Sequence, residues 1–296
     1  MLCTGLFGLC YPLTKLTQTY FSVAPVDIPS QLLLAGIRMC GSGVIMLVIG
    51  AITRTHKAPC RREWLGILLV ALFQVVIQYA LTYVGQGLSD GSKTPLLKGT
   101  SSFIVIILMH FLSKDDKLTW LKISGCVLGF FGVFVINVSS SFAFTFGAGE
   151  TLLIGSAIAS AIGYCCTKIY FSELPAATAQ GLAQTIGGGL MLIVGGITGG
   201  RLVALNEAAW LYLILIIIVT AVPFLIWTKL YRHNPASLMS VYELSTPLFG
   251  TFFMWTVFPE SDIFNWRFAL GGILIITGMF IACKARYKST DEKTPC

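Results

Sequence analysis

Residues 211–222 read LYLILIIIVTAV, and only Tyr212 and Thr220 interrupt the aliphatic side chains of this run. Similar windows of roughly 20 residues, almost free of charge, recur along the 296-residue chain, and a helix of that length crosses a hydrocarbon core about 30 Å thick. Charged residues make up 11% of the chain, against about 25% in a typical soluble domain. Because so little polar surface is available to face water, the sequence predicts an all-α membrane protein.

Ten transmembrane helices fit this length, because roughly 30 residues accommodate one span and its connection. The predicted spans are 2–22, 31–50, 64–84, 91–112, 119–138, 149–170, 177–198, 209–230, 236–257 and 266–284. Turn-forming sequences such as Ser89-Asp90-Gly91 and Asn234-Pro235 separate them. The first 20 residues lack a basic start and contain Lys15, so we expect the first helix to be retained and not cleaved as a signal peptide.

Lys and Arg residues are distributed unequally between alternate connections. Thirteen fall on the side of the membrane that carries the N-terminus, against three on the other side, Lys93, Arg201 and Arg267. An excess of Lys and Arg marks the cytoplasmic side of a membrane protein. We therefore expect both termini in the cytoplasm, in a bacterial plasma (inner) membrane. The same asymmetry accounts for the net charge of +7, so no nucleic-acid partner is predicted.

The two halves of the chain resemble each other in sequence. At a shift of 146 residues, Trp64 aligns with Trp210 and Trp120 with Trp266, which accounts for four of the six tryptophans. Further pairs at this shift are Thr100 and Thr246, Asp116 and Asp262, Gly125 and Gly271, and Gly132 and Gly278. The first helices match at a slightly larger shift, with residues 11–15 (YPLTK) against residues 164–168 (YCCTK). This similarity predicts an internal repeat.

Because each half contains five predicted spans, an odd number, the second copy enters the membrane from the opposite side. We therefore predict two inverted five-helix repeats, 1–140 and 141–288, followed by a cytoplasmic tail, 289–296. Inverted repeats are common in secondary transporters, where they provide two equivalent states that open to opposite sides of the membrane. An ancient duplication without a transport role is the alternative explanation.

Several short motifs resemble those of a known family. Residues 7–15 (FGLCYPLTK) are similar to the pattern W-G-x-x-F-x-x-x-K, and residues 61–64 (RREW) to R-x-E-W. Residues 245–249 (STPLF) match S/T-P-L-F, and the segment from Trp266 to Gly278 approximates W-x-G-x-x-L-I-x-x-G. In this order and spacing the motifs resemble the EamA-type transporters of the drug/metabolite transporter superfamily.

This resemblance covers nearly the whole chain and implies two five-helix repeats around a central cavity. It also implies export of amino acids, related metabolites or toxic compounds. Three features depart from the family pattern: Phe7 replaces the usual Trp, Lys98 lies in a fourth helix that is usually apolar, and Thr100-Ser101-Ser102 replaces S-P-L. These departures concern the substrate class and leave the expected fold unchanged.

Lys98 and Glu243 are the sharpest candidates for a role in transport. Each lies within a predicted span, where an ionisable group costs about 2.5–3.5 kcal/mol on insertion scales and usually lines a pathway or pairs with a partner. The 146-residue shift aligns Lys98 with Leu244, next to Glu243, so we expect the two side chains near the pseudo-two-fold axis. They form either a structural ion pair or contacts with a zwitterionic substrate or a proton. Helical spacing places Thr94 and Ser101 on the face of Lys98.

Six further residues are candidates for substrate binding, because amide, aromatic and basic groups within spans suit an amino acid or a small aromatic ligand. They are Gln74 and Gln78 one turn apart on the third span, Trp227 on the eighth, Arg38 on the second, and Tyr11 and Tyr164 at equivalent repeat positions. For Arg38, snorkelling or helix pairing is an equal alternative. Tyr83 and Tyr231, near span ends, are expected to be interfacial anchors.

Other function classes lack the motifs that they need. The sequence contains no metal-ligand spacing, paired carboxylates, H-E-x-x-H motif or phosphate-binding loop, so we predict neither an enzyme nor a primary pump, and no cofactor or metal. The leading hypothesis is a secondary transporter that exports amino acids or related small metabolites by alternating access. Its partners would be the small-molecule substrate and the lipid bilayer, with proton coupling left open. The alternative is a membrane sensor or assembly partner built on a transporter fold.

Overall fold

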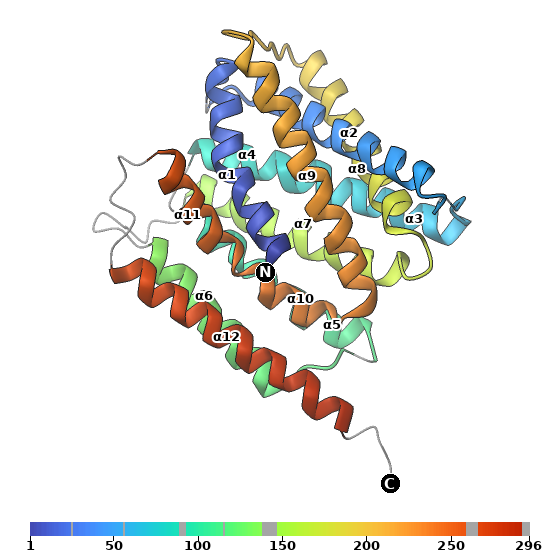
Figure 1. The fold of residues 1–296 in the computed structure, drawn as a ribbon, viewed down its shortest axis with the longest axis vertical. Coiled ribbons are helices and arrows are strands. Elements are labelled where there is room, and N and C mark those ends of the chain that lie inside the picture. Colours follow the sequence, from blue (N-terminus) through green and yellow to red (C-terminus); the bar gives the residue numbers. More distant parts are fainter. Residues whose placement is uncertain are drawn as a thin grey trace.

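The structure, a computed structural model, describes residues 1–24, 26–55, 57–88, 93–114, 116–137, 147–258 and 266–291. In these ranges the regular structure is helical and contains no strand, which confirms the all-α class. The elements are α1 (Leu2–Tyr20), α2 (Ile28–Ile52), α3 (Arg61–Val70), η1 (Ala71–Ile77), α4 (Gln78–Leu88), α5 (Lys93–Leu112), α6 (Trp120–Asn137), α7 (Ala148–Tyr170), α8 (Ala176–Ile197), α9 (Ala208–His233), α10 (Ala236–Glu243), α11 (Thr246–Val257) and α12 (Trp266–Asp291) (Figure 1).

Among the described residues, seven helical stretches are long and apolar enough to cross a membrane. They are Ile28–Ile52, Arg61–Gln86, Thr94–Leu112, Ala148–Tyr170, Ala176–Ile197, Ala208–His233 and Trp266–Lys284. The other predicted spans coincide with helices that are less apolar or shorter: α1 contains Lys15 and Gln18, α6 is short, and α10 and α11 are separate. The chain is therefore an integral membrane protein. The predicted repeat boundary at residues 140 and 141 and the tail residues 292–296 lie outside the described residues.

Two predicted spans differ from regular helices. The third contains η1, a π-helical segment between α3 and α4, and such segments occur frequently at functional sites. The ninth is interrupted at Leu244 and Ser245, so the prediction of one continuous helix there was wrong. Pro247 provides the physical reason, because proline has no N–H to donate to the carbonyl of Glu243, four residues earlier. Glu243 is consequently the last residue of α10.

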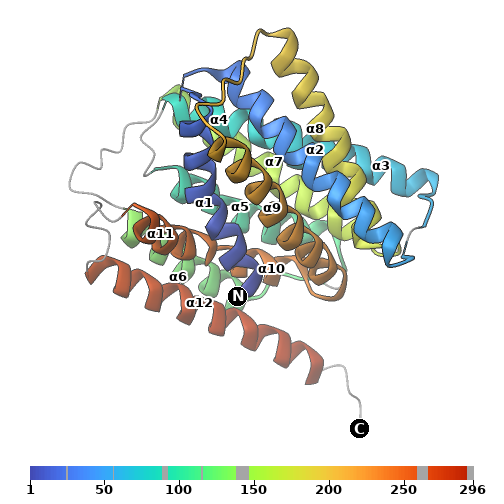
Figure 2. The same cartoon turned by 45° about the horizontal axis from the view of Figure 1, so that its top comes forward.

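Helices α6 and α12 pack against each other along one edge of the molecule, as Figures 1 and 2 both show. A Cβ atom at Gly125 would lie 2.5 Å from the Gly278 carbonyl oxygen, and one at Gly132 would lie 2.6 Å from the Gly271 carbonyl oxygen. The later residue of α6 therefore contacts the earlier residue of α12, so the two helices are antiparallel. The 146-residue shift exchanges these two contacts with each other.

Helices α2 and α8 form a second antiparallel pair on the opposite side of the molecule (Figure 1). A Cβ atom at Gly36 would lie 3.0 Å from the carbonyl oxygen of Gly188, and one at Gly43 would lie 2.7 Å from that of Gly181. Small residues allow this close approach, as is typical of helix pairs in membranes. Equivalent helices of the two halves thus pack antiparallel in both pairs.

The first helix of each half lies between these pairs. Helix α1 packs against α9 and α11, and helix α7 packs against α4 and α5. Exchanging the two halves converts one set of contacts into the other. The broken segment α10–α11 and helix α5 are equivalent, and both face the space between α1 and α7.

Candidate functional site

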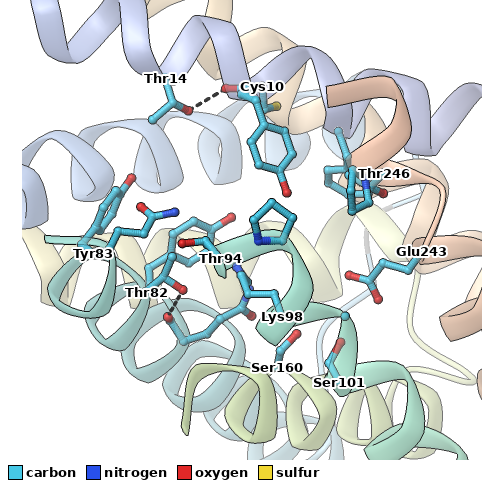
Figure 3. Close-up of a pocket in the computed structure, with 18 of the residues that line it drawn as sticks. Cys10, Thr14, Thr82, Tyr83, Thr94, Lys98, Ser101, Ser160, Glu243 and Thr246 are labelled. Atoms are coloured by element: carbon cyan, nitrogen blue, oxygen red, sulfur yellow. Dashed lines mark hydrogen bonds between the residues drawn. The ribbon is translucent and has the colours of Figure 1, made fainter. Parts of the chain in front are cut away.

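The space between the two halves contains a cavity of about 400 Å³. This volume is at the lower end of the roughly 300–1,000 Å³ that is typical of small-molecule sites. The polar and charged residues that line it are Thr14, Lys15, Gln18, Arg38, Gln78, Thr82, Gln86, Thr94, Lys98, Ser101, Ser102, Ser160, Glu243 and Thr246, together with the tyrosines Tyr11, Tyr79, Tyr83 and Tyr164. Figure 3 shows lining side chains from both halves, among them Thr14 and Lys98 from the first half and Ser160 and Glu243 from the second, converging on this space.

The cavity has an exposed end and a buried end. Lys15 and Gln86 are exposed at one end, whereas Ser102, Ser160 and Tyr164 at the other end are buried. The cavity is therefore accessible beside Lys15 and ends at Tyr164. Access from the opposite end is closed in this conformation.

Glu243 is anchored at the buried end of the cavity. Its Oε1 atom accepts a hydrogen bond of 2.6 Å from the Tyr164 hydroxyl group. Its Oε2 atom is buried and has no hydrogen-bond partner among the described residues. Figure 3 shows the carboxyl group directed into the cavity. Because α10 ends at this residue, the side chain lies at the break and not on a continuous helical face.

Lys98 lines the same cavity from α5, in the middle of the site. In the described part of the chain it forms neither a hydrogen bond nor an ion pair, and its Nζ atom lies 5.9 Å from the centre of the Tyr79 ring. The predicted proximity to Glu243 is therefore seen only as a shared cavity, because no ion pair joins the two residues in this structure. Thr94 and Ser101 also line the cavity, as the helical spacing indicated.

Several buried polar atoms of the lining have no hydrogen-bond partner among the residues that the structure describes. Besides Glu243 Oε2, these atoms are Gln78 Oε1, Thr94 Oγ1 and Thr246 Oγ1. Buried polar groups are normally hydrogen-bonded, and each exception needs an explanation such as water or a ligand. The concentration of such atoms around one cavity favours a polar ligand.

Arg38 reaches the cavity from α2 and is only 8% exposed. Its Nε atom donates to Thr220 Oγ1 at 2.8 Å and its Nη1 atom to Thr14 Oγ1 at 3.2 Å. No carboxylate pairs with it among the described residues. The alternative that this side chain snorkels to lipid headgroups is wrong, since the guanidinium group is buried between α1, α2 and α9.

Gln74 and Trp227 are the two predicted site residues that lie outside the cavity lining. Gln74 Oε1 accepts a hydrogen bond from Gln180 Nε2 of α8 at 3.2 Å. Gln74 lies within the π-helical segment η1, whereas Gln78 begins α4 and lines the cavity. Trp227 is 3% exposed and packs edge-on against Phe7, with ring centroids 5.9 Å apart.

An aromatic cluster closes the buried end of the cavity. The Tyr164 ring stacks on the Tyr231 ring at a centroid distance of 5.4 Å, and Trp227 packs against Tyr231 at 5.9 Å. The expectation that Tyr83 and Tyr231 are interfacial anchors was wrong: Tyr231 is fully buried in this cluster, and Tyr83 lines the cavity. Tyr11, by contrast, is a half-exposed residue of the lining.

Other lining residues were not among the predicted site residues. Tyr79 and Gln86 belong to this group, and with Tyr83 they follow the i, i+4, i+7 spacing of one helical face. That spacing was available in the sequence. No group of three or more His, Cys, Asp or Glu residues that could hold a metal ion occurs in the part of the chain that the structure describes.

Comparison with known proteins agrees with this architecture. The model of the EamA-like transporter family matches residues 2–138 and again residues 147–283. The uncharacterized transporter YvbV of Bacillus subtilis (strain 168) is 28% identical over 297 residues, covering 97% of this chain and 90% of that protein. The S-adenosylmethionine/S-adenosylhomocysteine transporter of Chlamydia muridarum (strain MoPn / Nigg) is 25% identical over 280 residues, covering 90% and 86%. A crystal structure of a protein shares the fold, with a TM-score of 0.77, 15% sequence identity and coverage of 99% and 98%.

Proposed function

The chain belongs to the EamA-like transporter family, and from this premise we propose that it is a secondary transporter that exports an amino acid or a related small metabolite by alternating access. Family members and the relatives described above are transporters and not enzymes. The membrane-spanning helices and the polar cavity between the two halves agree with this role.

The observation that carries the substrate class is the arrangement of Lys98 and Glu243. Both line one cavity, and no ion pair joins them in the described structure. An ammonium group on one wall and a carboxylate on another complement the carboxylate and ammonium groups of an amino acid. The chlamydial relative is named for S-adenosylmethionine and S-adenosylhomocysteine, which both contain an amino-acid group. That shared group is the part of a substrate that these two residues suit.

The test is transport of radiolabelled amino acids by the purified protein in proteoliposomes. We expect at least one amino acid to accumulate above protein-free vesicles, and unlabelled compound on the opposite side to stimulate its exchange. Lys98→Met and Glu243→Gln should each strongly reduce this exchange. If none of the natural amino acids or their nucleoside-linked derivatives is carried, the proposed substrate class is wrong.

Alternating access is supported by the antiparallel packing of α2 with α8 and of α6 with α12, which an inverted repeat requires. Ten spans in two inverted five-helix repeats, with both termini in a bacterial cytoplasm, remain our proposed topology. In that orientation Lys15 lies toward the outside, so the cavity is open outward and the aromatic cluster closes the cytoplasmic end. Labelling of Cys60, which is exposed between α2 and α3, from the cytoplasmic side only would agree with this orientation.

Lys168 and Lys15 occupy equivalent positions in the repeats but have different surroundings. Lys168 Nζ donates to carbonyl oxygens at the C-terminal end of α9, with distances of 2.8 Å to Tyr231, 3.2 Å to Arg232 and 2.9 Å to Asn234. These hydrogen bonds join α7 to the C-terminal end of α9, next to the aromatic cluster. Lys15 forms no such bonds among the described residues, and its Nζ atom lies 4.4 Å from the centre of the Phe258 ring.

The sequence repeat indicates which contacts Lys15 would make in the conformation that opens to the cytoplasm. At the shift of 146 residues, the three acceptors of Lys168 correspond to Gly85, Gln86 and Leu88 at the end of α4. We infer that Lys15 donates to these carbonyl groups when the outer end is closed, and that Lys168 then releases α9. Closing one end with one lysine and opening the other is how an inverted repeat produces two equivalent states.

A further inference from the structure

The described charges of the cavity lining do not balance. Three basic residues, Lys15, Arg38 and Lys98, face one acidic residue, Glu243. Lys15 is exposed at the mouth, where water solvates its ammonium group. Lys98 and Glu243 are matched by the two charges of a zwitterion. Arg38 is then a buried positive charge for which neither the described protein nor a neutral amino acid supplies a counter-charge.

The hydrogen bonds of Arg38 leave donors available. A guanidinium group has five N–H donors, and among the described residues two of them are used on the neutral hydroxyl groups of Thr14 and Thr220. The other side chains that interact with the guanidinium group, those of Tyr83 and Cys10, are also neutral. A buried charge is normally paired, because an unpaired one is costly in a medium of low dielectric constant. Intramembrane arginines of this kind are by default candidates for a functional site.

The surroundings of Arg38 differ from those of Lys98 and Glu243. Arg38, Thr14 and Tyr83 line both the main cavity and a small recess beside it. In Figure 3, Tyr83 and Glu243 lie on opposite sides of the cavity, with Lys98 between them. A substrate held by Lys98 and Glu243 at its amino-acid end would therefore extend its side chain toward Tyr83 and Arg38.

Resting on the proposed function, we propose that Arg38, with the hydroxyl group of Tyr83, forms an anion subsite, so that the transported amino acid carries a second acidic group. The planar guanidinium fork suits a carboxylate or a phosphate, to either of which it can donate two parallel hydrogen bonds. S-adenosylmethionine carries a sulfonium cation in place of an acidic group, so this cavity disfavours it electrostatically. The substrate class therefore differs in charge from the one for which the chlamydial relative is named.

A structural role for Arg38 is the competing explanation, since its two hydrogen bonds also join α1, α2 and α9. The two roles make different predictions for matched ligands. An anion subsite discriminates between an acidic amino acid and its neutral isostere, whereas a purely structural arginine does not. Discrimination by the unmodified protein therefore decides the question even if Arg38 variants fail to fold.

The experiment measures binding of unlabelled ligands to the purified full-length protein by competition and by thermal stabilisation. The probes are L-glutamate against L-glutamine, L-aspartate against L-asparagine, and O-phospho-L-serine against L-serine, with S-adenosylmethionine as the cationic member. We expect at least one acidic member to bind about ten-fold or more tightly than its neutral partner. Preference within the first two pairs assigns a carboxylate, and preference within the third assigns a phosphate.

Variants of Arg38 test whether this residue causes the preference for acidic ligands. Arg38→Gln should reduce the acidic preference to about two-fold or less while neutral amino acids bind as before, and Arg38→Lys should retain part of it. Arg61→Gln, at an exposed position at the start of α3, is the matched control and should change nothing. Equal binding of acidic and neutral partners by the unmodified protein, or an Arg38→Gln variant that keeps the full preference, overturns the anion subsite alone. Absence of binding for every amino acid overturns the proposed function and the subsite with it.

Discussion

Neutralising Lys98 or Glu243 should strongly reduce transport and leave the protein folded. Lys98 has no ion-pair partner among the described residues, and Glu243 keeps its hydrogen bond from Tyr164. Lys98→Met therefore breaks no ion pair or hydrogen bond, and it removes an insertion cost of at most about 2.5–3.5 kcal/mol. Glu243→Gln preserves both the shape of the side chain and an acceptor for Tyr164. We expect an apparent melting temperature in detergent equal to or above that of the unmodified protein.

A true buried ion pair in the same chain provides the matched control. Lys122 Nζ lies 2.7 Å from Asp116 Oδ1, and the two side chains are 10% and 3% exposed. Asp116 also accepts hydrogen bonds from Ser237. Lys122→Met leaves this carboxylate without its counter-charge, which typically costs about 3–5 kcal/mol. The same Lys→Met substitution should thus lower the melting temperature clearly at residue 122 and not at residue 98.

The transport assay completes this prediction. Truncating one partner of a buried charge contact costs about 2 kcal/mol or more, so exchange in proteoliposomes should fall at least about 30-fold for either variant at low substrate concentration. The reasoning is refuted if Lys98→Met unfolds the protein and the double variant with Glu243→Gln restores both folding and transport. That result would mean that the two residues form a structural ion pair.

Three further predictions follow from individual contacts. Tyr164→Phe removes one hydrogen bond to the carboxylate of Glu243, worth about 1.5–3 kcal/mol, and should weaken substrate binding about ten-fold or more in a competition assay. Gly188→Ala should lower the free energy of unfolding by roughly 1–3 kcal/mol, because its Cβ atom would collide with the backbone of Cys40. Gly189→Ala is the control, since a Cβ atom there has no other atom within 4 Å. Equal melting temperatures for the two variants would contradict the α2–α8 packing. Lys168→Met removes the three hydrogen bonds that join α7 to the end of α9 at the cytoplasmic end of the cavity. We expect faster thiol labelling of the cavity from the cytoplasmic side. An unchanged labelling rate would show that Lys168 does not keep this end closed.

Much of the fold could be predicted from hydropathy and from the internal repeat, because both depend only on the order of residues in the sequence. Predicted spans coincided with helices to within a few residues, and the four glycines paired by the 146-residue shift all lie at the α6–α12 contact. The break after Glu243 could have been inferred from Pro247, whose missing N–H was visible in the sequence. The π-helical segment could not, because it depends on how α3 and α4 pack against α7 and α8.

The candidate site was predicted less completely. Lys98, Arg38, Glu243, Gln78, Tyr11 and Tyr164 were found because a charged, amide or aromatic residue within a span stands out. Gln74 lies one turn from Gln78 but outside the cavity lining, because its side chain hydrogen-bonds to Gln180 of α8. The hydrogen-bond partner of Glu243 depends on which helices pack together in three dimensions. The spacing of residues along the sequence does not predict that packing. Only the structure revealed that Tyr164, and not Lys98, holds the carboxylate.

The central claim is that one cavity opens alternately to the two sides of the membrane. Ser160→Cys, in a background without the other reactive cysteines, places a thiol at the buried end of the cavity. A membrane-impermeant thiol reagent is then added to one side or the other of oriented vesicles, and the labelling rates are compared. Alternating access predicts labelling from both sides, with bound substrate slowing both rates. Labelling from only one side, under all conditions that support exchange, would contradict the account.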